Sequence, residues 1–177
     1  RPSEKRTGTK SDKLADFLES NPEVPCVVDP VMIATSGAKL VADEAIEVYK
    51  TQLLPRAALI TPNIDEAQVL LDDKTIDADN QEKAARELSE RYRCPVLLKG
   101  GHLDGDPVDL LFEKGEVYRW THERLDNVNT HGSGCMLSAA ITSYLARGKS
   151  LREAVEKGLK TIHKVLANSV EPAEGIV

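Results

Sequence analysis

Two glycines, a serine and a cysteine stand together in the segment NTHGSGCMLSAAI (residues 129–141), just ahead of an apolar stretch. A helix N-terminus presents unpaired backbone N–H groups and a partial positive charge, and glycine lets an anion approach that backbone closely. Gly132, Ser133 and Gly134 therefore predict an anion-binding turn. The alternative interpretation is a plain glycine-rich helix start in which Ser133 is the N-cap.

A thiol follows this turn directly. Cys135 would lie in the first turn of the helix, where the helix dipole favours the thiolate and where reactive cysteines are found. In the alternative interpretation Cys135 is only a small buried apolar residue. Cys26 lies inside an apolar run and Cys94 just before another, so we expect these two thiols to be structural.

Three other segments place chemistry-bearing side chains directly after short apolar runs. Asp29 follows VPCVV, Asn63 follows AALITP with Glu66 one turn further on, and Lys99 follows PVLL. Two acids, an amide and a lysine are the groups that phosphate and metal chemistry needs. Each also has a simpler interpretation, because Asp29 could begin a turn, Asn63 could cap the next helix and Lys99 could be a solvated strand end.

Helical and strand patterns alternate along the chain. We expect strands over 24–30, 57–61 and 95–101, an antiparallel hairpin over 108–121 around a Lys-Gly turn, and helices over 12–20, 42–54, 64–71, 80–93, 135–148 and 151–170. Such alternation predicts an α/β fold with a parallel sheet covered on both faces. Ligands then bind beyond the carboxyl ends of the strands, where the candidate residues stand.

The composition limits the partners. The 177 residues are 41% hydrophobic and 29% charged, as in one ordinary globular domain. A formal net charge of −6 argues against nucleic acid or an anionic membrane as partner, and no apolar run reaches membrane-spanning length. Three cysteines, an odd number at spacings that match no zinc or disulfide pattern, indicate a reducing compartment. We therefore expect a cytoplasmic protein.

Four segments in this order, VVDPVMIATSG, LITPNIDEAQVLL, VLLKGGH and NTHGSGCMLSAAITSYLARG, resemble the hydroxymethylpyrimidine and phosphomethylpyrimidine kinases of thiamine biosynthesis, members of the ribokinase-like superfamily. The resemblance runs from about Asp12 to Val170. It implies a three-layer α/β/α sandwich with a mostly parallel central sheet and an antiparallel hairpin in the C-terminal half.

The resemblance also implies a division of the chain. Residues 1–11 are expected to be a polar tail or a join, and 12–177 the C-terminal portion of the kinase domain. The strand and glycine-rich segment with which family members begin, and which hold the pyrimidine, are not recognisable before Asp12. We expect this part to be missing from the sequence.

The activity implied is transfer of a phosphoryl group from ATP to 4-amino-5-hydroxymethyl-2-methylpyrimidine and then to its monophosphate, with Mg²⁺ as cofactor. By resemblance, Gly132, Ser133 and Gly134 form the anion hole and Cys135 stands where related kinases carry an aspartate base. The remaining roles implied are nucleotide contacts for Asn63, Lys99 and Thr130, metal contacts for Asp29 and Glu66, and a loop near the site for Thr35, Ser36 and Gly37.

Two other functions remain open, and relatives commonly form homodimers. A pyridoxal kinase-like activity is one alternative, because some pyridoxal kinases of the superfamily share the cysteine and overlap in substrate. The other is a catalytically idle binding or regulatory module, which the missing pyrimidine-binding part would explain. Turnover of the two acceptors, measured side by side, separates the two kinase activities.

Overall fold

The computed structural model describes residues 10–33, 39–72, 75–101, 103, 106–125, 130 and 132–168. Within these, β1 (Val27–Val28), β2 (Leu59–Ile60), β3 (Val96–Leu98), β4 (Val108–Glu113) and β5 (Glu116–Thr121) form one sheet in that spatial order. Thr35, Ser36, Gly37, His102 and most of the predicted tail lie outside the described residues.

The sheet is mixed rather than wholly parallel. β1, β2 and β3 run parallel, with Val28 opposite Ile60 and Ile60 opposite Val96, whereas β4 runs antiparallel to both β3 and β5. The predicted hairpin over 108–121 is confirmed, because Lys114 and Gly115 both take positive φ angles (53° and 85°), as a two-residue hairpin turn requires. Because the chain reverses direction both before and after β4, β5 runs in the same direction as β3.

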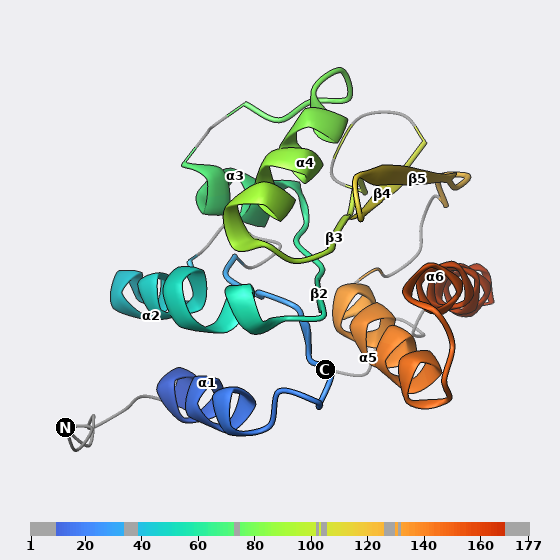
Figure 1. Ribbon diagram of the computed structural model, residues 1–177. Helices are drawn as coiled ribbons and strands as arrows, with labels where there is room; N and C mark the ends of the chain where they lie inside the picture. The colour runs from blue at the N-terminus through green and yellow to red at the C-terminus, as the bar shows by residue number, and fades with distance from the viewer. Residues whose placement is uncertain are drawn as a thin grey trace, which may run out of the picture.

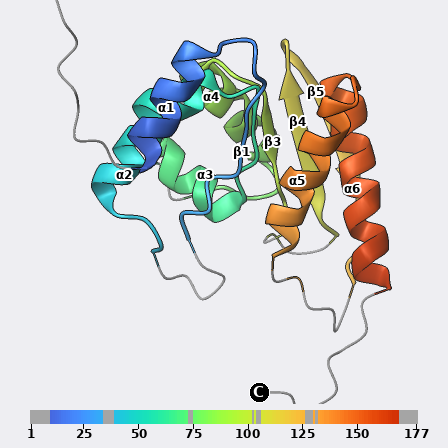
Figure 2. The same ribbon diagram turned by 90° about the horizontal axis from the view of Figure 1, so that it is seen from below.

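Helices cover both faces of the sheet, giving three layers (Figures 1 and 2). One face is covered by α1 (Lys10–Ser20), α2 (Asp43–Val48), α3 (Ile64–Leu71) and α4 (Gln81–Tyr92), and the other by α5 (Ser133–Ala146) and α6 (Leu151–Ala167). None of the helices in the described part of the chain is long and apolar enough to cross a bilayer.

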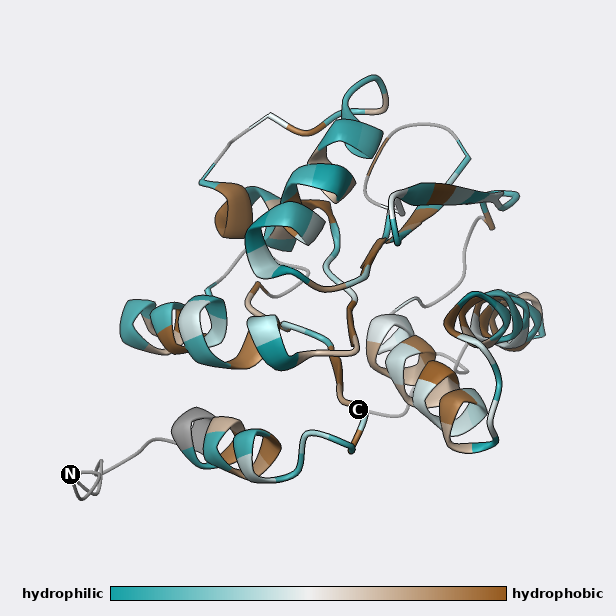
Figure 3. Ribbon diagram, in the orientation of Figure 1, coloured by the Kyte–Doolittle hydropathy of each residue, from teal (hydrophilic) through white to brown (hydrophobic). Residues whose placement is uncertain are grey.

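Alternate strand residues feed two separate cores. Val96 and Leu98 pack toward α4, while Leu97 between them packs toward α5 and α6, and all three are fully buried. This is the period of two that a strand imposes on its side chains. The apolar faces of the helices turn toward the sheet, as the hydropathy colours show (Figure 3).

The three parallel strands are shorter than predicted, and the ends of α4, α5 and α6 differ from the predicted ranges by one to three residues. Two further differences concern α1 and the helix before β2. The helix expected over 42–54 is α-helical only to Val48, continues as a π-helix over Tyr49–Leu53, and ends in a 3-10 turn over Leu54–Arg56. Pro55 lacks an N–H donor, so the helical pattern must change around it. At the other boundary, α1 begins at Lys10, inside the predicted tail.

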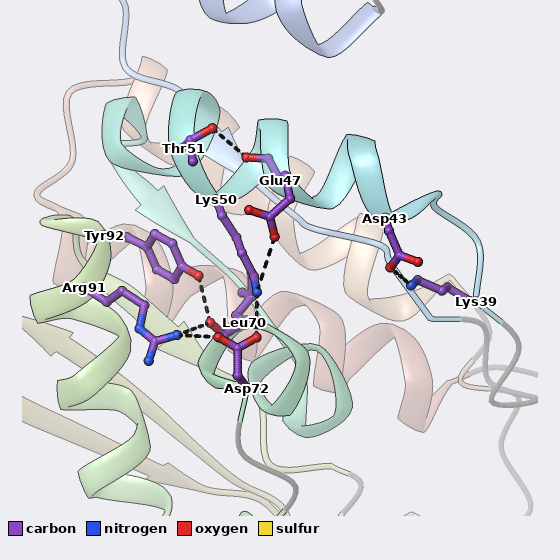
Figure 4. A network of polar contacts seen from close by, with 9 residues as sticks. All are labelled: Lys39, Asp43, Glu47, Lys50, Thr51, Leu70, Asp72, Arg91 and Tyr92. Atoms are coloured by element: carbon purple, nitrogen blue, oxygen red, sulfur yellow. Dashed lines mark hydrogen bonds and ion pairs between the residues drawn. The ribbon is translucent and has the colours of Figure 1, made fainter.

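The π-helix is joined to two other helices by one carboxylate (Figure 4). The carboxylate of Asp72, just past α3, accepts hydrogen bonds from Lys50 Nζ at 2.8 Å and from Arg91 at 3.2 Å. These two cations hold the pKa of Asp72 below its ordinary value. Arg91 and Tyr92 of α4 also donate to the Leu70 carbonyl at 2.9 and 2.8 Å. These bonds fix the layer of α2, α3 and α4 that supports the strand ends.

The contact between α5 and α6 yields a prediction. A Cβ on Gly158 would lie 2.8 Å from Ile141 Cγ1 and 3.3 Å from Leu137 Cδ1, so the two helices approach too closely for alanine. Gly158→Ala should lower the free energy of unfolding by about 1–3 kcal/mol from overpacking, outweighing a gain of about 1 kcal/mol in helix propensity. Urea unfolding measures this, with the exposed Lys157→Ala as control. A stabilised Gly158→Ala protein would contradict the close packing.

Candidate active site

The carboxyl ends of the parallel strands bring a lysine and an aspartate together. Asp29 follows β1 and Lys99 follows β3, and Lys99 Nζ lies 3.0 Å from Asp29 Oδ1. Both side chains are mostly buried, with 15% and 13% of their surface exposed. The parallel pairing of β2 with β3 continues beyond the ends of the two strands. Lys99 N donates to the Pro62 carbonyl at 2.9 Å, and Asn63 and Lys99 form an isolated parallel β-bridge. Strand pairing therefore places the ion pair.

The first turn of α5 lies against this pair. Its N-cap is Gly132, in the left-handed conformation (φ 78°), so Ser133 is not the capping residue. A Cβ on Gly134 would stand 3.1 Å from Lys99 Nζ and 3.7 Å from Asp29 Oδ2. Glycine at this point lets the backbone of the helix start approach the ion pair directly, as the predicted anion-binding turn requires.

The structure brings every described candidate to one place. A single cleft of about 600 Å³ is lined by all nine residues that the sequence singled out: Asp29, Asn63, Glu66, Lys99, Thr130, Gly132, Ser133, Gly134 and Cys135. Its position beyond the strand ends is the one that α/β topology favours for a ligand. The convergence is thus a geometric fact, whereas the roles of the residues remain predictions.

Glu66 is held by backbone groups. Its Oε2 accepts from Asn63 N at 2.9 Å and its Oε1 from Met32 N at 3.2 Å, while Asn63 Oδ1 accepts from Glu66 N at 2.8 Å. Asn63 and Glu66 therefore form a capping box at the start of α3. Burial raises the pKa of Glu66, and the two N–H donors and Lys99 oppose that rise. The simpler interpretation of Asn63 as a cap is thus correct, and both residues also line the cleft.

Cys135 is exposed, but its surroundings do not favour the thiolate. Partial burial and the neighbouring Asp29 carboxylate raise the pKa of the thiol, and Lys99 only partly offsets them. The sequence predicted that the helix N-terminus would lower the thiol pKa, and the structure gives the opposite direction. Burial disfavours the charged thiolate, and a carboxylate next to the sulfur opposes a second negative charge. Cys94 is buried, which raises its pKa to about 12 and suits a structural role.

Sequence analysis missed the other end of the cleft, where His122 and His163 meet. Their rings stack with centroids 5.7 Å apart, and each leaves a buried Nε2 without a hydrogen-bond partner among the described residues. Asp109 Oδ2 lies 3.3 Å from His122 Nε2, and Asp109 Oδ1 accepts from Gly100 N at 3.0 Å. His163 occurs in the apolar pattern of α6 beside Ile162, and that position was the available signal.

The rest of that end is mainly apolar, although Glu123 and Arg124 also border it. Its apolar lining is formed by Leu159, Ile162, Leu166, Pro107 and Leu125. The cleft thus has a charged end at the strand tips and an apolar, histidine-bearing end under α6. A ligand with an anionic part and a flat, weakly polar part matches this division.

Comparisons with known proteins decide the family. A sequence model of the phosphomethylpyrimidine kinase family matches residues 8–177. The chain belongs to this family. It is 45% identical over 137 residues to the thiamine biosynthesis bifunctional protein ThiED of Geobacter sulfurreducens, covering 77% of this chain and 28% of that protein.

Two solved structures are similar to this family member. Phosphomethylpyrimidine kinase from Clostridium difficile matches with a TM-score of 0.76 at 37% identity, over 88% of this chain and 63% of that one. Pyridoxal kinase from Staphylococcus aureus matches with a TM-score of 0.82 at 30% identity, over 96% and 62%. The chain spans about half the length of the curated hydroxymethylpyrimidine/phosphomethylpyrimidine kinases that it matches.

The position of Cys135 yields a prediction about its reactivity. Because the Asp29 carboxylate raises the thiol pKa, Asp29→Asn should lower that pKa and speed alkylation of Cys135 by iodoacetamide at pH 8. Because the thiolate is the form that reacts, a lower thiol pKa raises the thiolate fraction at pH 8 and therefore the alkylation rate. Peptide mass spectrometry measures the rate, with Cys26 in the same sample as internal reference. Equal Cys135 rates in the two proteins would show that the carboxylate does not control the thiol.

Proposed function

We propose that this chain carries the phosphoryl-transfer site of a kinase that uses ATP to phosphorylate 4-amino-5-hydroxymethyl-2-methylpyrimidine and then its monophosphate. The observation that carries the proposal is the Lys99–Asp29 pair lying against Gly134 at the N-terminus of α5. Membership of the phosphomethylpyrimidine kinase family supports the choice of acceptor.

Phosphoryl transfer depends mainly on positioning and on stabilising negative charge. Lys99 supplies a cation 3.0 Å from Asp29, and it can turn toward a phosphate because it already borders the cleft. Backbone N–H groups at the start of α5, around Gly132 and Gly134, supply fixed dipoles for the phosphoryl oxygens, while Ser133 N donates to the Thr130 carbonyl at 3.1 Å. Asn63 and Thr130 line the same cleft and are assigned nucleotide contacts.

The carboxylates suit a hydrated magnesium ion. In the described ranges no group of three or more His, Cys, Asp or Glu side chains is spaced to hold a metal by itself. Mg²⁺ is typically bound by one or two carboxylates, retained waters and substrate phosphates. Asp29 borders the cleft directly, while Glu66, whose oxygens accept from backbone N–H groups, would act through water. When bound, the ion neutralises charge on the phosphates.

The apolar end of the cleft suits the base of the nucleotide. Leu159, Ile162 and Leu166 offer apolar surface, and the stacked rings of His122 and His163 add a flat surface beside it. In this proposal the phosphates bind at the strand tips and the base binds under α6. The acceptor then approaches from the side of Cys135.

Finer features are part of the same proposal. The three layers and the strand order support a ribokinase-like sandwich of which this chain is the C-terminal portion. A homodimer and a cytoplasmic location remain proposals, the latter supported by three free thiols, at Cys26, Cys94 and Cys135.

A second candidate is pyridoxal phosphorylation, favoured by the similarity to pyridoxal kinase from Staphylococcus aureus. Initial rates with each acceptor at equal concentration, with ATP and Mg²⁺, distinguish the two activities. The leading proposal expects a higher kcat/KM for the hydroxymethylpyrimidine. A higher kcat/KM for pyridoxal would make pyridoxal phosphorylation the preferred function. If neither acceptor is phosphorylated, the function that remains is the catalytically idle binding or regulatory module.

We expect Glu66→Gln to weaken the magnesium-dependent part of ATP binding. The amide keeps an acceptor oxygen for one backbone N–H but removes the negative charge that favours a hydrated cation. Calorimetric titration of ATP with and without Mg²⁺ measures this, and Glu87→Gln, on the outer side of α4, is the matched control. An unchanged magnesium dependence would assign Glu66 a structural role only.

We expect Cys135 to act as the base that removes the hydroxyl proton of the acceptor. Cys135→Ala should lower kcat roughly 10² fold with nucleotide binding nearly unchanged, since a base acts chiefly in the transition state. Because burial and the Asp29 carboxylate raise the pKa of the Cys135 thiol, the thiolate fraction and kcat should increase with pH from 7 to 9.

Cys135→Asp is the matched test of that base role. Its carboxylate is already ionised across this pH range, so its kcat should vary little with pH and should exceed that of Cys135→Ala. If Cys135→Ala turns over within a few-fold of wild type, the thiol is only a small residue that fits the turn.

A further inference from the structure

Two buried hydroxyl groups connect the ion pair to α5. Thr61, at the end of β2, is fully buried, and its Oγ1 donates to Asp29 Oδ1 at 3.2 Å. The same atom lies 3.0 Å from Oγ of Ser138, whose Oγ lies 3.1 Å from the Gly134 carbonyl. Neither hydroxyl side chain lines the cleft. The chain of contacts thus runs from Asp29, behind the cleft, to the first turn of α5.

The surroundings do not call for polar side chains at these positions. Ser138 is 8% exposed, and its neighbours Leu137 and Ile141 belong to the apolar core beneath α5. Burying a hydroxyl is unfavourable unless it is hydrogen-bonded, and valine or alanine would fill similar space without that requirement. The two hydroxyls therefore have a purpose that packing alone does not supply.

Counting hydrogens gives the chain a direction. Two hydroxyl groups have two hydrogens to share among three contacts. The Asp29 carboxylate, ion-paired with Lys99, can only accept, so Thr61 gives its hydrogen to Asp29. When Ser138 gives its hydrogen to Thr61 at 3.0 Å, it gives up the alternative bond within the helix to the Gly134 carbonyl at 3.1 Å, and that carbonyl keeps its ordinary helical partner. Both links must be present for α5 to be tied to Asp29.

We propose that Thr61 and Ser138 are positioning residues whose hydroxyls, acting in series, tie Asp29 to α5 at Ser138, one helical turn after Gly134. The tie holds Gly134 in register with the Asp29–Lys99 pair, where a Cβ would already be 3.1 Å from Lys99 Nζ. The tie itself is a property of the ligand-free chain. Its consequence for phosphoryl transfer rests on the proposed function.

The tie is tested without any ligand by amide hydrogen exchange, followed by NMR at residues 136–138 of α5. Thr61→Val should speed exchange there about tenfold or more, because the first turn opens locally more often. Thr61→Ser keeps the hydroxyl and should restore protection. Thr142→Val is the matched control, since Thr142 Oγ1 donates to the Ser138 carbonyl at 2.7 Å, a hydrogen bond that lies wholly within α5. Unchanged exchange in a folded Thr61→Val protein overturns the inference.

The serial arrangement is tested by combining substitutions. Ser138→Ala alone should also speed exchange, and Thr61→Val with Ser138→Ala should be no faster than Thr61→Val alone, because either change breaks the same chain. Effects that multiply would show two independent contacts and overturn the series.

The kinetic consequence separates this inference from the proposed function. Thr61→Val should lower kcat about tenfold or more, with KM for ATP within about twofold, since a small misplacement acts mainly in the transition state. Thr61→Ser should recover most of kcat. Faster exchange in a protein whose wild type phosphorylates neither acceptor would reject the proposed function and support the tie. Normal kcat in Thr61→Val would reject the positioning role.

Discussion

The ion pair between Lys99 and Asp29 is the interaction on which the site depends. It joins the carboxyl ends of β1 and β3 across β2, with 3.0 Å between Nζ and Oδ1 and both side chains mostly buried. A buried charge that loses its partner is costly, so each member keeps the other in place. Gly134 must lack a side chain because α5 begins against this pair, and Thr61 holds the carboxylate from beneath. The pair thus determines how closely α5 can approach the sheet.

The same carboxylate governs the neighbouring chemistry. Burial and the Asp29 carboxylate both raise the pKa of the Cys135 thiol, and the same two causes raise that of Glu66. Two carboxylates beside one lysine leave an excess of negative charge, which the cation of the proposed function would balance. Family membership and this electrostatic arrangement therefore both support the proposed phosphoryl-transfer site. The chain spans only about half the length of the curated kinases.

The cleft also joins distant parts of the chain. Asp109 in β4 holds Gly100, next to Lys99, and lies beside His122, whose ring stacks on His163 of α6. The charged end and the apolar end of the cleft are thus connected through backbone and side-chain contacts rather than through one element.

The sequence by itself determined the features that depend on neighbours along the chain. The bounds of α3 were predicted to the residue, because the capping box of Asn63 and Glu66 is a local signal, and the hairpin followed from Gly115. The candidate residues stood at strand ends, whose carboxyl ends share one edge of any parallel sheet. Only the tertiary structure decided the acidity of Cys135, the pairing of His122 with His163 and the tie through Thr61 and Ser138. These depend on charges and contacts between residues far apart in the chain, which no local pattern records.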